Sequence, residues 1–121
     1  MTARIGNVAF DCADVLRTAR FWSAVLGRAL DATSTAEFAS IGGADADRGE
    51  PAWYFNRVAE RKQAKNRVHL DMIDPDPSSV DRLVALGATV IGSHSFGSHR
   101  WTVLQDPEGN EFCVAAQPFS G

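Results

Sequence analysis

The chain reads as two consecutive copies of one structural unit, and this repeat is the strongest constraint on its fold. In each copy a strand pattern leads into a helix pattern that ends in Leu-Gly, at Gly27 and at Gly87, and shorter strand patterns follow. Aligning Asn7 with His69 gives an offset of about 60 residues, which indicates a tandem pair. One helix covers one face of a sheet and leaves the other open, so neither copy buries a full core alone. We therefore expect an α+β fold in which two βαβββ modules pair around a cleft.

The length suits one domain built from these two modules. The chain has 121 residues, which is the size of a single ordinary domain. We expect a single domain over residues 1–121, with module 1 at 4–58, module 2 at 66–117, and a polar, charged linker at 59–65 between them.

Apolar periodicity and turn residues place the elements of each module. In module 1 we expect, in chain order, a strand at 5–11, a helix from the N-cap Asp14 to Gly27, a weak strand at 29–33, and strands at 37–41 and 52–57. In module 2 we expect a strand at 67–72, a helix capped by Asp76, strands at 89–93, 100–104 and 111–114, a loop at 93–98 and a tight turn at 106–109. Large aromatic residues on a helix face mostly supply buried area, so Phe21 and Trp22 are assigned to the core.

Composition and charge exclude several classes of partner. The net charge of −3 argues against a nucleic-acid or anionic-membrane surface, which needs a clustered basic patch. No stretch approaches the roughly 20 apolar residues of a membrane span, and the first residues have no apolar signal-peptide core. Cys12 and Cys113 form neither a disulfide framework nor a zinc-type spacing. We expect a cytoplasmic protein.

The strand at 67–72 carries the most distinctive chemistry. Successive side chains of a strand point to opposite faces, so the apolar and ionisable residues separate here. One face carries Val68, Leu70 and Met72, and the other carries Arg67, His69 and Asp71. A row of ionisable residues of both signs, with a histidine in the middle, indicates that this face of the strand borders a functional site.

Three motifs resemble those of the vicinal oxygen chelate superfamily. They are Asn-Val-x-Phe-Asp-Cys-Ala-Asp with Phe-Trp-x-x-Val-Leu-Gly, then Lys-Asn-Arg-Val-His-Leu-Asp-Met, and finally Asp-Pro-Glu-Gly-Asn-Glu-Phe-Cys-Val. This superfamily includes glyoxalase I, bleomycin-resistance proteins and extradiol dioxygenases, and the chain is most similar to small bacterial glyoxalase-like domain proteins. The resemblance covers Ile5 to Ala116. It implies a glyoxalase-like fold and a homodimer.

The resemblance also identifies where a metal would lie. Metal-dependent members carry a His or Gln on the first strand, a Glu or equivalent on the fourth, a His on the fifth and a Glu on the eighth. The matching positions here are Asn7, one of Trp53, Tyr54 and Phe55, then His69 and Cys113. Only His69 is a family ligand, and one residue cannot hold a divalent ion, which needs three or four donors. We therefore expect no metal and no other cofactor, with a rearranged set of His69, Asp71 and Glu111 as the alternative.

His69 and Asp71 are the predicted catalytic pair. An imidazole exchanges protons near neutral pH, so His69 is suited to act as a general acid or base. A carboxylate of Asp71 oriented onto the ring would favour its charged form. The alternative is a neutral cleft histidine that is hydrogen-bonded to Asn7 or Asp71 and ties the two modules together. Arg67 is either an exposed charge or a bidentate partner for a ligand carboxylate or phosphate.

Cys113 has two interpretations. A nucleophilic thiol needs a neighbouring base or cation to stabilise the thiolate. Glu111, two residues away on the same face, would instead disfavour the thiolate, so a packed and inert thiol is favoured.

Aromatic residues are predicted to wall an apolar pocket, as in most small-molecule sites. Trp53, Phe55 and Trp101 are the residues proposed, although a shift of one residue in strand parity would turn any of them toward a helix. His94 and His99 flank a Ser/Gly-rich loop. Histidines in such loops are usually exposed to solvent, and the alternative is that this loop acts as a lid over the site.

Two functions follow from the sequence, and a third is weaker. The first is a metal-free enzyme, of lyase or isomerase type, that uses His69 on a small oxygenated or aromatic molecule. The second is a non-catalytic protein that sequesters such a ligand, and the third is a metal-dependent glyoxalase or dioxygenase. The predicted ligand-binding residues are Asn7, Trp53, Phe55, Arg67, Trp101, Glu111 and Cys113.

Overall fold

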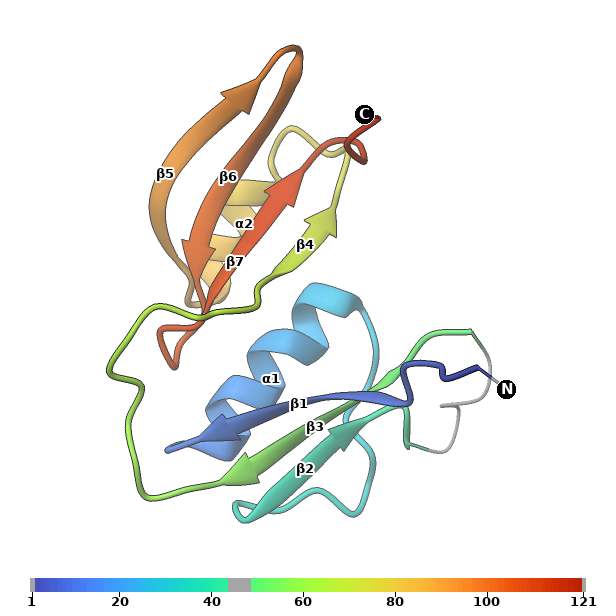
Figure 1. The fold of residues 1–121 in the computed structure, drawn as a ribbon. Coiled ribbons are helices and arrows are strands. Elements are labelled where there is room, and N and C mark those ends of the chain that lie inside the picture. The colour runs from blue at the N-terminus through green and yellow to red at the C-terminus, as the bar shows by residue number, and fades with distance from the viewer. Residues whose placement is uncertain (1, 44–48, 121) are drawn as a thin grey trace. The chain divides into compact units, whose positions relative to one another are not determined.

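The computed structural model describes residues 2–43 and 49–120, and the chain divides into two compact units, Met1–Arg61 and Lys62–Gly121. In the described residues each unit has one sheet and one helix (Figure 1). The α+β class and the two-module organisation predicted from the repeat are therefore confirmed. None of the helices described is long and apolar enough to cross a membrane.

The first unit is a three-stranded sheet with one helix. Its elements are β1 (Asn7–Cys12), α1 (Val15–Leu26), β2 (Phe38–Ile41) and β3 (Ala52–Arg57). The strand order is β1-β3-β2, with β1 parallel and β2 antiparallel to β3.

Helix α1 begins and ends where the sequence predicts. The Asp14 carboxylate accepts a hydrogen bond from the backbone N–H of Arg17 at 3.2 Å, which satisfies one of the free donors of the first turn. Gly27 closes the helix with φ of 64°, a left-handed conformation that glycine adopts without a Cβ clash.

The strand predicted at 29–33 is reduced to a single bridge between Leu30 and Ile41. The Asp31 carboxylate accepts hydrogen bonds from Ser40 Oγ at 2.6 Å and from the backbone N–H of Gly43 at 2.9 Å. Such side-chain bonds compete with a strand ladder and favour a turn. The first sheet therefore has three strands where the βαβββ pattern predicted four.

An aromatic cluster fills the core of the first unit. Phe10, Trp22, Trp53 and Phe55 have ring centroids 5.1–5.5 Å apart in the contacting pairs. Trp22 and Phe55 are fully buried, and Phe21 is also buried, as predicted for the aromatic face of the helix.

The second unit is a four-stranded sheet, with helix α2 behind it in the view of Figure 1. Its elements are β4 (Leu70–Ile73), α2 (Ser79–Leu86), β5 (Thr89–Phe96), β6 (His99–Gln105) and β7 (Glu111–Ala115). The strand order is β4-β7-β6-β5, with β4 parallel to β7 and the other pairs antiparallel.

Three boundaries in the second unit differ from prediction by more than one residue. Strand β4 begins at Leu70 and not at 67, because the backbone N–H of Asn66 is hydrogen-bonded to the Glu111 carboxylate and the chain joins the ladder only later. Helix α2 has Ser78 as its N-cap, while Asp76 accepts from the N–H and hydroxyl of Ser78 and orders the preceding turn.

The third difference is the loop predicted at 93–98. Strand β5 continues through this segment to Phe96, and a tight turn at 97–98 connects it to β6. Gly97, with φ of 60°, permits a two-residue hairpin connection.

The aromatic cluster generates a stability prediction. Trp22→Ala should lower the free energy of unfolding by about 3–5 kcal/mol, because it removes a fully buried ring and leaves a cavity. Urea denaturation measures this loss. Phe38→Ala, at a half-exposed position of the same unit, is the control and should cost much less; equal losses would contradict the assignment of the core.

Candidate functional site

The open face of the second sheet brings three of the predicted polar residues together, His69, Asp71 and Cys113. Asp71 of β4 lies opposite Cys113 of β7, and Cys113 lies opposite Val103 of β6. Paired residues of neighbouring strands point to the same face. The next row along this face contains Ile73 opposite Ala115, and His94 opposite Trp101.

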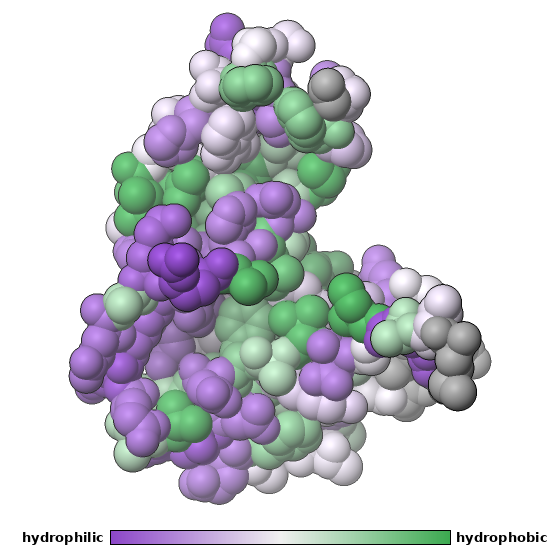
Figure 2. Space-filling view, viewed as in Figure 1, coloured by the Kyte–Doolittle hydropathy of each residue, from purple (hydrophilic) through white to green (hydrophobic). Residues whose placement is uncertain are grey.

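This face lines a cavity of about 660 Å³ that lies wholly within the second unit. Its apolar walls include Ile73, Ile91, Val103, Ala115, Phe96 and Phe119. Figure 2 shows hydrophobic residues exposed among hydrophilic ones on the surface of the molecule. A mostly apolar cavity with a few polar groups is typical of a small-molecule site.

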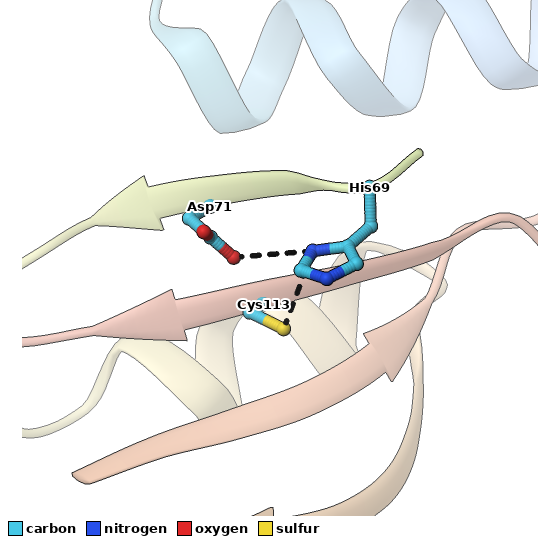
Figure 3. Close-up of side chains that lie close together, drawn as sticks. All are labelled: His69, Asp71 and Cys113. Carbon is cyan, nitrogen blue, oxygen red and sulfur yellow. Dashed lines mark hydrogen bonds and ion pairs between the residues drawn. The ribbon is translucent and has the colours of Figure 1, made fainter. Parts of the chain in front are cut away.

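His69, Asp71 and Cys113 form the polar cluster of the cavity (Figure 3). His69 Nδ1 is 3.3 Å from Asp71 Oδ1 and 3.9 Å from Cys113 Sγ. The side chains of His69 and Asp71 are 46% and 66% exposed, so solvent and a ligand can reach them. The carboxylate therefore orients the imidazole at the surface of the cavity.

The Cys113 thiol is poorly suited to act as a nucleophile. Burial, the negative charge of Asp71 and a hydrogen bond with that carboxylate together raise the pKa of Cys113 to about 11. The thiol therefore keeps its proton at neutral pH, and nucleophilic attack needs the thiolate. Cys113 is buried, as the favoured interpretation of the sequence expects, but the carboxylate that raises its pKa is that of Asp71 and not that of Glu111.

Glu111 is an anchor for the chain entering β4. Its carboxylate accepts from Lys62 Nζ at 2.9 Å and from the backbone N–H of Asn66 at 3.1 Å. Burial alone would raise the pKa of Glu111, but these hydrogen bonds outweigh burial and hold it below the ordinary value. Most of its hydrogen-bonding capacity is thus already used within the fold, although the residue also borders the cavity.

A group of stacked rings forms the other end of the cavity. Trp101 stacks on His94 and His99, with centroid distances of 5.8 and 5.5 Å, and Phe119 meets His99 edge-on at 5.4 Å. Sequence reasoning missed the two histidines because it placed them beside a loop. The signal was the alternation of serines with His94 and Phe96 before Gly97, which is the pattern of a hairpin strand.

A β-bulge gives these rings their orientation. The register of β5 against β6 shifts between Val90, which lies opposite Leu104, and Gly92, which lies opposite Val103. One extra residue changes which face the following side chains occupy. His94 and Phe96 consequently point into the cavity.

Other predicted site residues lie elsewhere. The prediction that Trp53 and Phe55 wall a pocket is wrong, because both pack against Phe10 in the buried cluster of the first unit. Strand parity is the cause, since Tyr54 between them points to the opposite face. Asn7 is exposed in β1 of the first unit, and Arg67 is exposed before β4 and does not line the cavity.

The residues do not fit the metal set of the superfamily's metal-dependent members. Within the described part of the chain, His69, Asp71 and Cys113 are the group of donors that meets the geometry for an ion, with ligand atoms within 4.8 Å of one another. His69 is the family ligand among them, and Cys113 holds its proton where the family has a carboxylate. A thiol donor favours softer ions than the usual nitrogen and oxygen set does.

Comparison with known proteins identifies the family. A family model described as "Glyoxalase-like domain" matches residues 7–115, so the chain belongs to the glyoxalase-like domain family, within the vicinal oxygen chelate superfamily. Among curated proteins, none matches the chain.

Solved structures share the fold. A mutant of the fosfomycin resistance protein FosX from Listeria monocytogenes, complexed with Mn(II) and 1S,2S-dihydroxypropylphosphonic acid, is 13% identical with a TM-score of 0.77, covering 98% of this chain and 94% of that one. A glyoxalase/bleomycin resistance protein/dioxygenase family enzyme from Burkholderia phytofirmans is 23% identical with a TM-score of 0.65, covering 93% and 97%. The bleomycin-binding protein from Streptomyces verticillus, complexed with copper(II)-bleomycin, is 20% identical with a TM-score of 0.63, covering 98% and 100%.

The Cys113 environment generates a prediction about thiol reactivity. At pH 8 a thiol of pKa about 11 is ionised in about one molecule per thousand, so Cys113 should react slowly with iodoacetamide. Asp71→Asn removes the negative charge and should accelerate alkylation severalfold, as mass spectrometry of the Cys113 peptide would show. Asp81→Asn, at an exposed aspartate of α2, is the matched control. An unchanged rate in Asp71→Asn would refute the role of Asp71.

The Glu111 anchor generates a pH-dependent stability prediction. Glu111→Gln should lower the free energy of unfolding by about 1.5–3 kcal/mol near neutral pH, because it removes charged hydrogen bonds in a mostly buried setting. Since the pKa of Glu111 is depressed below 4.5, the contribution is complete above that pH and is lost as the pH falls through the lower folded value. Denaturation series at pH 7 and pH 3 measure the difference. Glu60→Gln, at an exposed position, should change neither.

Proposed function

We propose that the open face of the second sheet binds a small oxygenated or aromatic molecule and that His69, oriented by Asp71, acts on it as a general acid or base without a metal. The observation that carries this proposal is the position of the imidazole. His69 is half-exposed, lies 3.3 Å from the Asp71 carboxylate, and borders an apolar cavity of about 660 Å³. A histidine held by a carboxylate at the wall of such a cavity is suited to proton transfer.

The remaining groups support a proton-transfer role. The Cys113 thiol is protonated, so covalent catalysis through this sulfur is disfavoured. The Glu111 carboxylate is already bound by Lys62 and Asn66. Asp71 contacts the imidazole and is therefore a positioning residue, while His69 is the group that would exchange the proton.

The test begins with a ligand screen on protein dialysed against EDTA. Phenols, aromatic carboxylates, α-keto acids and epoxides are the probes, with NMR of the His69 ring reporting binding and one-dimensional NMR reporting conversion. His69→Gln should lower kcat/KM about 100-fold or more while leaving the fold intact. Asp71→Asn should cause a smaller loss and move the pH profile, and Asp81→Asn is the control. Conversion that persists in His69→Gln, or that requires added metal, would reject the proposal.

A second function is favoured by the apolar walls and the stacked rings. A protein that only sequesters its ligand would show binding without conversion of any probe, and Trp101→Leu would weaken the affinity. The Streptomyces neighbour that binds copper(II)-bleomycin supports this alternative through its fold. The screen separates the two functions, because it reports binding and conversion independently.

We also propose that the protein forms a homodimer, as the family resemblance implies, and that it is located in the cytoplasm. Sedimentation equilibrium measures the oligomeric state directly.

A further inference from the structure

The floor of the cavity contains a small side chain between two large ones. Ala115 of β7 is paired with Ile73 of β4 on one side. On the other side, Thr102 of β6 is paired with Val114 of β7. The residues that follow this pair along the two antiparallel strands, Trp101 and Ala115, therefore lie beside each other on the cavity face. These three residues line the cavity, so a slot one strand wide runs over Ala115.

The slot has the width of a flat ring. Neighbouring strands are about 4.8 Å apart, so the strands carrying Ile73 and Trp101 are separated by about 9.6 Å. A ring standing over Ala115 needs a contact distance of about 3.5–4.0 Å on each side, or about 7–8 Å in total. A planar ring therefore contacts both walls, and little additional thickness is accommodated.

The wall at Trp101 is rigid and aromatic. His94, its cross-strand partner on β5, stacks on the indole at 5.8 Å, and His99 stacks on it at 5.5 Å. His94 lies on the β5 side of Trp101, whereas Ala115 lies on the β7 side and lines the cavity together with the indole. A ring wall that is held before binding loses little entropy when the ligand arrives.

Hydrogen-bond donors lie one row away from the slot. The His69 imidazole reaches over Cys113, with Nδ1 3.9 Å from the sulfur. Cys113 precedes Ala115 by two residues on the same face, a separation of about 6.6–6.8 Å along the strand. The Lys65 side chain also borders the cavity, and its positive charge acts on Cys113. An oxygen substituent attached directly to a ring over Ala115 points toward these donors.

Building on the proposed function, we propose that the ligand is a planar aromatic ring bearing an acidic oxygen group, that the ring lies over Ala115 between Ile73 and Trp101, and that Ala115 limits the size of the ring. The acidic oxygen accepts hydrogen bonds from Lys65 and His69. Asp71 carries the opposing charge in this region, and its carboxylate is directed at His69.

The experiment compares two acids that differ in planarity. The dissociation constants of 2-naphthoate and of its saturated analogue, decahydro-2-naphthoate, are measured by calorimetry. Wild-type protein should bind the aromatic acid about threefold to tenfold more tightly, because stacking of the ring on Trp101 contributes binding free energy beyond that of the buried apolar area. In Trp101→Leu this preference should disappear.

The slot itself is tested by filling it. Ala115→Val should weaken 2-naphthoate binding at least tenfold, since added carbons occupy the space of the ring. Ala116→Val is the matched control; Ala116 is exposed, does not line the cavity, and should leave the affinity within about twofold. Circular dichroism checks that Ala115→Val is folded, and if it is not, Trp101→Leu alone decides the inference.

The outcomes separate this inference from the proposed function. Equal affinity for the two acids, no effect of Ala115→Val in a folded protein, or no binding of either acid overturns the aromatic slot. The proposed function survives each of these results if another probe of the screen perturbs the His69 ring and is converted. Loss of all conversion with naphthoate still bound in the slot instead rejects the acid–base role and leaves the slot standing.

Discussion

The parallel pairing of β4 with β7 is the constraint on which the site depends. It places Asp71 beside Cys113 and sets the His69 imidazole above both, although the two strands lie far apart in the sequence. The Glu111 carboxylate secures this arrangement at its start by holding Lys62 and Asn66, the residues that lead into β4. Glu111, which the sequence predicted to bind a ligand, therefore contributes to positioning His69 and Asp71.

The two units place their aromatic side chains differently: one buries them against its helix, and the other exposes them on the open face of its sheet. In the first unit the aromatic side chains of β1 and β3 are turned into a buried cluster with Trp22 of α1. In the second unit aromatic side chains are turned to the open face, where Trp101 stacks with two histidines. The repeat in the sequence predicts one architecture for both halves, but the cavity and the cluster of His69, Asp71 and Cys113 lie in the second.

The fold was largely predictable from local signals, whereas the site was predictable only where strand parity was certain. Asp14 and Gly27 are strong helix boundaries because each satisfies a specific backbone requirement. His69 and Asp71 were found because they alternate with apolar residues. Trp53 and Phe55 were misplaced because every residue from 52 to 55 is apolar or aromatic, so periodicity cannot distinguish the two faces. The Glu111 anchor joins residues too distant in sequence for any local pattern to reveal it.

The bulge in β5 holds one residue more than the pairing with β6 requires. Deleting that residue, Ile91, would bring Gly92 directly after Val90 and restore regular pairing, while His94 and Phe96 would keep their partners on β6 and stay on the cavity face. A loss of three nucleotides would thus remove one apolar side chain from the cavity wall and leave its aromatic rings in place. The volume of the cavity is therefore open to change by a deletion that the sheet and the stacked rings both tolerate.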